Sequence, residues 1–307
     1  MVPLLERRVL FITGKGGVGK TTVATAIALL GRRQKKRVLM VQLNPISSLP
    51  DSSLAQAKPQ RGRWGFWVVR IDPQRALEEF LHGLLRFRFL SRRLLSSTTF
   101  QLVTAAAPGL EAFLALTRIL EWEKARHPLR GKPVYDLIIV EAPATGHSLS
   151  FFQVPTSLLN LASVGPFANT LKQLSTLLAD QQKTALLLVT SPEEMAVNEA
   201  VEAYQHLKHH TPLPLFPPIL NGAYLPSLSP EEEEAVLSVS PTDHPLLQAV
   251  RYHVRRCVAT AAAASRLEQE LAVRPILLPF LFAKKVTKEH MEVLARVFAE
   301  RIIGAYA

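Results

Sequence analysis

Apolar runs of strand length alternate with stretches of helical periodicity along most of the chain, which predicts an α/β fold. One run, 135–140, is apolar on both faces, as strands inside a parallel sheet are. We expect strands at 8–13, 37–43, 64–71, 135–140, 184–190, 218–221 and 275–282. We expect helices at 20–33, 110–124, 193–210, 246–271 and 287–303. The order predicts a mostly parallel central sheet flanked by helices, with the loops after the strands gathered at one edge.

The length of 307 residues, which a single α/β domain can reach undivided, predicts one domain over residues 1–307 with insertions. A helical insertion subdomain is expected at about 73–130, and a further helical segment at 148–180, broken at Gly165 and Pro166. Residues 227–245 are expected to be loop-like, with the acidic block at 231–234 as a solvated helix start. No internal repeat is found, which excludes a duplicated chain with two such domains.

The segment 84–95 inside this insertion is apolar and basic and carries no acid. On a helix, Leu84, Phe87 and Leu94 fall on one face, whereas on a strand Phe87 and Phe89 alternate with arginines. We interpret it as a helix that meets lipid or an apolar segment of a client protein. A helix packed on the core with its arginines in water fits the pattern equally well.

A glycine-rich loop follows the first strand and precedes an Ala-rich helix. Gly14, Gly19, Lys20 and Thr21 satisfy the spacing G-x-x-x-x-G-K-[ST], which predicts a P-loop NTPase fold that binds ATP and Mg²⁺. Lys20 supplies charge to the β- and γ-phosphates, and the Thr21 hydroxyl is expected to ligate Mg²⁺. The residues expected to surround the phosphates are Gly14, Lys15, Gly16, Gly17, Val18, Gly19, Lys20, Thr21 and Thr22.

Lys15, directly after the first glycine, offers a second cation early in the loop. A lysine there points away from its own phosphate site and can reach the phosphates of a partner's nucleotide, as an arginine finger does. A homodimer is therefore expected, although a solvated loop lysine is the simpler alternative.

The amino-acid composition limits which classes of partner and which cellular compartment we expect. The formal net charge is +11, which favours an acidic partner such as nucleic acid, an anionic membrane surface or an acidic protein, or serves solubility alone. No apolar run reaches the ~18 residues of a membrane span. The first residues leave no room for a signal peptide, and the single cysteine, Cys257, fits a reducing compartment. We expect a cytoplasmic protein, peripheral at a membrane if the segment 84–95 meets lipid.

Several motifs together resemble the ArsA-type ATPases, the family of arsenite-pump ATPases and of ATPases that guide tail-anchored membrane proteins. The phosphate loop matches throughout, and Asn44-Pro45 stands where the first switch begins. The residues 142–147 resemble the second switch, and 108–111 resemble the Pro-Gly element that opens a helix of the helical subdomain. The resemblance implies that Asn221 and the Leu278-Pro279 loop contact adenine. It also implies a dimeric Mg²⁺-dependent ATPase that couples its nucleotide state to a client.

Three departures from the family pattern qualify this expectation. Asn44 replaces the first-switch aspartate, which positions the attacking water and supports Mg²⁺ through water, so hydrolysis is expected to be slow. Glu141 replaces the second-switch aspartate and, with Gly146, is expected to sense the γ-phosphate. The catalytic residues implied are thus Lys15, Asn44 and Glu141. Cys257 alone supports neither a thiol site for arsenite nor a Cys-x-x-Cys zinc pair.

Two alternatives remain open for the function. The chain could be a hydrolysis-deficient regulatory subunit that forms a heterodimer with an active paralogue. It could instead be a partition-type ATPase that binds DNA or membrane through its basic surface, with nucleic acid the less favoured partner.

Overall fold

A computed structural model describes residues 3–43, 58–62, 64–71, 107–159, 165–239 and 244–305. Asn44, the segment 84–95 and the rest of the insertion before residue 107 lie outside these ranges, and so do the predictions made for them. The described residues form an eight-stranded sheet in the order β3-β4-β2-β5-β1-β6-β7-β8. All neighbouring strands pair in parallel except β3 and β4, so the predicted α/β fold with a mostly parallel sheet is confirmed.

The strands lie close to the predicted positions. Their bounds are β1 Val9–Thr13, β2 Val38–Gln42, β3 Gln60–Arg61, β4 Trp67–Arg70, β5 Leu137–Glu141, β6 Thr184–Thr190, β7 Ile219–Ala223 and β8 Ile276–Pro279. The central strand β1 is buried on both faces because its side chains alternate between two cores. Leu10 and Ile12 enter one core, and Val9 and Phe11 enter the other.

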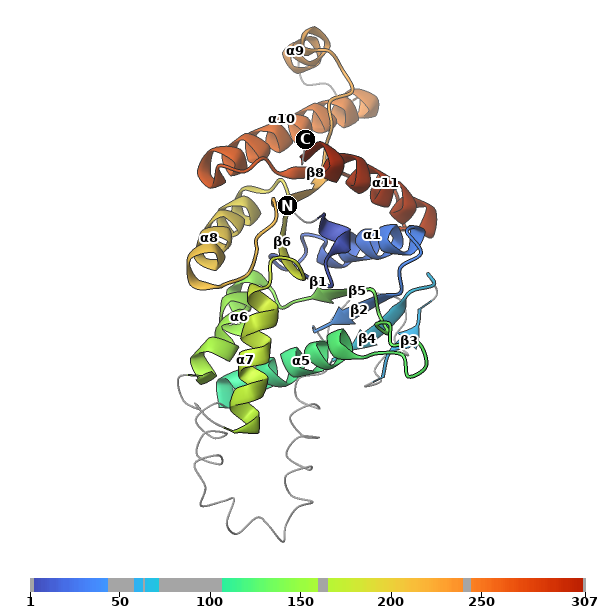
Figure 1. Cartoon of the computed structure of the whole chain (residues 1–307). Coiled ribbons are helices and arrows are strands. Elements are labelled where there is room, and N and C mark those ends of the chain that lie inside the picture. The colour runs from blue at the N-terminus through green and yellow to red at the C-terminus, as the bar shows by residue number, and fades with distance from the viewer. Residues whose placement is uncertain are drawn as a thin grey trace.

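Helices cover both faces of the sheet (Figure 1). Their bounds are α1 Lys20–Arg33, α5 Ala107–Lys124, α6 Thr145–Leu159, α7 Pro166–Ala179, α8 Glu194–His210, α9 Pro230–Ser238, α10 Pro245–Leu271 and α11 Lys288–Ala305, after the 3-10 turn η1 Leu4–Glu6. α1 and α11 pack on each other on one face, and α5, α6 and α7 cover the other. α8 and α10 continue that second layer over β6 and β7. None of the helices in the described ranges combines the length and apolar character that crossing a bilayer requires.

Several details differ from the sequence prediction. The second-switch motif is not all loop, because α6 begins at Thr145 and includes Gly146 in its first turn. Residues 227–245 were expected to be loop-like with a helix start at 231–234, and the helix there, α9, continues to Ser238 behind a capping box that joins Ser229 and Glu232. Helix α1 is buried around most of its circumference, because α11 covers its outer side. The short strand β3 was not expected, and Pro108 lies inside the first turn of α5 instead of before it.

Cys257 lies in α10 and is buried. Burial raises the pKa of its thiol, which is typical of an inert structural cysteine. Its neighbour Val254 is also buried, whereas Val258 is exposed.

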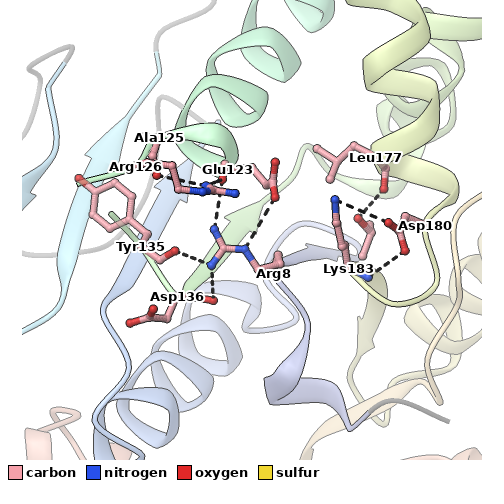
Figure 2. A network of polar contacts seen from close by, with 10 residues as sticks. Arg8, Glu123, Ala125, Arg126, Tyr135, Asp136, Leu177, Asp180 and Lys183 are labelled. Carbon is pink, nitrogen blue, oxygen red and sulfur yellow. Dashed lines mark hydrogen bonds and ion pairs between the residues drawn. The ribbon is translucent and has the colours of Figure 1, made fainter. Parts of the chain in front are cut away.

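The end of the sheet remote from the glycine-rich loop is braced by Arg8, just before β1 (Figure 2). Its guanidinium donates to the carbonyl oxygens of Tyr135 at 2.6 Å, Asp136 at 3.0 Å and Glu123 at 3.1 Å. The carboxylate of Glu123 lies 3.7 Å away. The brace therefore joins the start of β1 to the end of α5 and to the turn that enters β5.

Candidate functional site

The glycine-rich loop connects the end of β1 to the start of α1 and lies against the ends of β6 and β7. Gly14 and Gly19 have φ angles of +150° and +91°, which side chains rarely adopt. A Cβ atom on Gly14 would lie 2.1 Å from the backbone carbonyl oxygen of Val189. A Cβ atom on Gly19 would lie 2.2 Å from the side-chain amide nitrogen (Nδ2) of Asn221. Glycine is therefore required at both ends of the loop by backbone conformation and by space.

The tip of the loop is open. Gly16 and Gly17 are exposed, and a Cβ atom on either would meet nothing within 4 Å. Val18 is buried and anchors the loop, while Thr22 is half-buried in the first turn of α1. Backbone N–H groups at the start of a helix, with room in front of them, suit an anion such as phosphate.

Lys20 follows this loop as the first residue of α1 and is 7% exposed. Its ammonium donates to the carbonyl oxygens of Gly14 and Lys15, each at 2.9 Å. Burial lowers the pKa of Lys20, and the charges of Glu141 and Glu199 act in the opposite direction. A buried ammonium held at the mouth of a glycine loop is suited to bind a phosphate oxygen.

Thr21 and Glu141 form an oxygen-rich pair beside Lys20. The Thr21 hydroxyl donates to one carboxylate oxygen of Glu141 at 2.6 Å, and the amide of Gln42 donates to the other at 3.2 Å. Glu141 is the last residue of β5 and is 4% exposed. Mg²⁺ prefers oxygen ligands such as hydroxyl and carboxylate groups. The pair of Thr21 and Glu141 therefore fits a magnesium ion held between the protein and a phosphate. Asn44, also assigned to that ion, lies outside the described residues.

Lys15 points to Glu199 of α8, where its ammonium lies 3.2 Å from a carboxylate oxygen. The Thr145 hydroxyl, at the start of α6, donates to the other oxygen of the same carboxylate. Hydrogen bonding from Thr145, and then the contact with Lys15, hold the pKa of Glu199 below its usual value against the effect of burial.

Glu199 was missed by the sequence analysis because α8 carries no motif. The only signal was an acidic residue near the start of the helix that follows β6, the neighbour of β1.

Gly146 lies in a small pocket between α6 and α8. A Cβ atom there would meet nothing within 4 Å. The pocket has a volume of about 280 Å³, and its polar lining residues include Thr145, Ser148, Glu199, Glu202 and His206. The second-switch residues therefore lie next to Lys15 through Glu199, and Glu141 connects them to Thr21.

Asn221 and Pro279 lie on the adjacent strands β7 and β8. The amide of Asn221 donates to the carbonyl oxygen of Val18 at 2.9 Å, so it fastens the phosphate loop to β7. Pro279 pairs with Ala223, two residues after Asn221. Their contact with adenine stays a prediction.

Comparison with known proteins supports the resemblance to the ArsA-type ATPases that the motifs of the sequence indicated. The sequence profile of the anion-transporting ATPase (ArsA) family matches residues 7–163. The chain is 32% identical over 234 residues to the ATPase BagA of Mycobacterium tuberculosis strain H37Rv, covering 73% of this chain and 68% of that protein. It is 25% identical over 240 residues to a putative arsenical pump-driving ATPase of Chlorobaculum tepidum, covering 65% and 57%.

A more distant similarity is to the ATPase GET3 of Debaryomyces hansenii, with 27% identity over 165 residues, covering 50% of this chain and 47% of that protein. The matched region begins just before β1 and includes the glycine loop and the end of β5, where Lys20, Thr21 and Glu141 meet. The profile match over half of the chain, together with the similarity to BagA, shows that the chain belongs to the ArsA family of ATPases.

Proposed function

We propose that this protein is a dimeric, Mg²⁺-dependent ATP-binding switch that hydrolyses ATP slowly and couples its nucleotide state to a client. The observation that carries this proposal is the buried Lys20 ammonium, held 2.9 Å from two carbonyl oxygens of the glycine loop. A phosphate bound there would compensate the cost of burying the charge, because it supplies the negative partner that the carbonyl groups only approximate.

Each polar group around Lys20 has a role in this proposal. The amides of the loop and of Thr22 surround the β-phosphate, while Thr21 and Glu141 hold Mg²⁺, which neutralises phosphate charge when it is bound. Asn221 fastens the loop and contacts adenine together with Pro279. Asn44 orients water without carrying the charge of an aspartate, so chemistry is slow.

Lys15 acts across the dimer. Its side chain is 35% exposed and its ammonium lies outside the cluster formed by Lys20, Thr21 and Glu141. Once it leaves Glu199, a cation at that position can neutralise the phosphates of a partner's nucleotide, so ATP favours the dimer. A second copy of this chain and a paralogue are both compatible partners.

The second switch transmits the nucleotide state. Only residues 142–144 separate Glu141 from the start of α6, so a displacement at Glu141 reaches α6 directly. Helix α6 packs on α5 and α7, and α5 belongs to the same insertion as the segment 84–95, which precedes it in the chain. We propose that this basic, apolar segment contacts the client protein or membrane component, at the cytoplasmic side of a membrane.

The client is not arsenite in this proposal, although some relatives are named arsenical pump-driving ATPases. A trivalent arsenical binds through several thiolates, and this chain has one cysteine, which is buried. A protein or lipid client fits the basic and apolar character of the segment 84–95 better.

The test measures ATP binding by calorimetry and oligomeric state by sedimentation, with and without Mg²⁺. Lys20→Ala should abolish Mg·ATP binding. Lys15→Ala should keep the affinity within about threefold, because a surface cation adds little to its own site, but should lose the ATP-dependent dimer. Lys208→Ala, on the exposed end of α8, is the control. A wild-type protein that fails to bind Mg·ATP would disprove the proposal.

A further inference from the structure

Glu199 connects two parts of the site that nucleotide is proposed to move. One carboxylate oxygen lies 3.2 Å from the Lys15 ammonium of the phosphate loop. The other accepts a hydrogen bond from Thr145, at the start of the second-switch helix. A single side chain therefore holds both groups at once.

The carboxylate is anchored on a rigid element. The neighbours of Glu199 on α8, Val197 and Ala200, are buried against β6 and α10. Lys15 lies in a half-exposed loop, whereas Thr145 follows a three-residue connection. Because α8 is the fixed partner, the two loops are the groups that would move when the contacts break.

Building on the proposed function, we propose that Glu199 is a positioning residue that retains Lys15 within its own subunit until Thr145 moves with the second switch. While both contacts are present, the charge of Lys15 is neutralised by Glu199 and is not available to a partner's phosphates. When the γ-phosphate draws the second switch toward the loop, Thr145 leaves the carboxylate. Lys15 then keeps only a half-exposed ion pair, which is weak, and is released to the dimer interface.

The size of the effect follows from the exposure of the contacts. Both side chains of the ion pair are 35% exposed, so solvent screens the attraction. An exposed pair together with one hydrogen bond to a charged group corresponds to about a threefold to tenfold change in an equilibrium. Glu199 therefore adjusts the Mg·ATP concentration at which the dimer forms without abolishing dimerisation.

The chain offers a matched control on the same helix. Glu202 lies nearly one turn further along α8 and lines the same pocket, but it makes neither contact. Glu199→Gln removes the charge at nearly constant size, and Glu202→Gln removes an equal charge from the same surface. Glu199→Asp keeps the charge on a shorter side chain and tests for rescue.

The experiment titrates Mg·ATP against the full-length protein and follows the dimer by sedimentation. Glu199→Gln should form the dimer at about threefold to tenfold lower Mg·ATP than wild type, Glu199→Asp should lie closer to wild type, and Glu202→Gln should match it. At about 0.5 M salt the wild-type midpoint should approach that of Glu199→Gln, because salt screens the ion pair. Circular dichroism and thermal unfolding confirm that each variant folds.

The failures of the two proposals are distinguishable. If wild type binds Mg·ATP and dimerises but Glu199→Gln needs an equal or higher concentration, the retention of Lys15 is wrong while the proposed function stands. The same holds if Glu202→Gln shifts the midpoint as much as Glu199→Gln does, because the effect is then one of surface charge. If wild type neither binds Mg·ATP nor dimerises, both proposals are wrong.

Discussion

The hydroxyl of Thr21 donates a hydrogen bond to the carboxylate of Glu141 at 2.6 Å, so the first turn of α1 is joined to the end of β5. Glu141→Gln keeps the size of the side chain and an oxygen that accepts from Thr21, but removes the charge. We expect the Mg²⁺-dependent affinity for ATP to fall about tenfold to a hundredfold, as when groups that support a metal site are changed. Calorimetry with Mg²⁺ and with EDTA measures this difference.

Without Mg²⁺, the same variant should bind ATP at least as well as wild type, because a negative charge beside the phosphates is gone. Asp136→Asn, which removes a carboxylate beside Arg37 and the Arg8 brace, is the control. An equal loss of affinity in both buffers would show that Glu141 supports the loop and not the metal.

Gly19→Ala should abolish ATP binding and lower the free energy of unfolding by about 1–3 kcal/mol, because it adds backbone strain to a steric clash. The strain comes from the φ angle of +91°, and the clash from an added Cβ atom 2.2 Å from the amide of Asn221. Gly131→Ala is the matched control, since its φ is +62° and its Cβ would meet nothing within 4 Å. Urea denaturation should give about 1 kcal/mol for the control, with ATP binding intact.

The ion pair between Arg37 and Asp136 predicts a pH dependence of stability. Two guanidinium N–H groups donate to the carboxylate at 2.9 and 2.8 Å, and hydrogen bonding from Arg37 lowers the pKa of Asp136 from its ordinary value of 3.8. A lowered carboxyl pKa means that the folded state favours the charged form. The stabilisation is therefore present above about pH 4 and is lost as the pH falls through the folded-state pKa.

Asp136→Asn should accordingly lower the free energy of unfolding by about 1 kcal/mol or less at pH 7, because the pair is partly solvated. The difference from wild type should shrink below about pH 4. Urea denaturation of both proteins between pH 7 and pH 3 tests this. A difference that stays constant across this range would mean that the charge of Asp136 contributes nothing.

Asn44→Asp should raise the rate of ATP hydrolysis about a hundredfold if the missing carboxylate limits the reaction. Residue 44 comes two positions after the end of β2, which pairs with β5, the strand that ends in Glu141. Single-turnover hydrolysis with radiolabelled ATP measures the rate, and Asn44→Ala is the control that adds no charge. An unchanged rate in Asn44→Asp would favour the alternative of a regulatory subunit that needs an active paralogue.

The sequence predicted most accurately the elements that a motif or an uninterrupted apolar run defines. The bounds of α1 and β6 coincide with expectation, because a glycine motif defines the first and an uninterrupted apolar run defines the second. The residues around the phosphate loop were predictable for the same reason, since a conformation that only glycine adopts leaves a mark in the sequence.

Contacts between distant segments left no such mark. Glu199 sits in an ordinary amphipathic helix, and its pairing with Lys15 depends on how α8 packs beside β6. The start of α6 at Thr145 was missed because Pro143 and Gly146 indicate a loop, although Pro143 lies before the helix and a single glycine, Gly146, is tolerated in its first turn. Helix α9 has no buried residues and carries no apolar stripe, so only its start was predicted, from the acidic block at 231–234.

The Arg8 brace holds the start of β1 in place, whereas the other end of the strand leads into the phosphate loop. Because the start of β1 is held to α5 and to the turn before β5, the strand cannot slide along its axis when its far end meets a ligand. A rearrangement at the phosphate loop is therefore expected to spread through Glu141 and the connection 142–144 into α6, while α8 stays in place through its packing on β6 and α10. The central strand and α8 then form the stationary frame, and α6 is the lever.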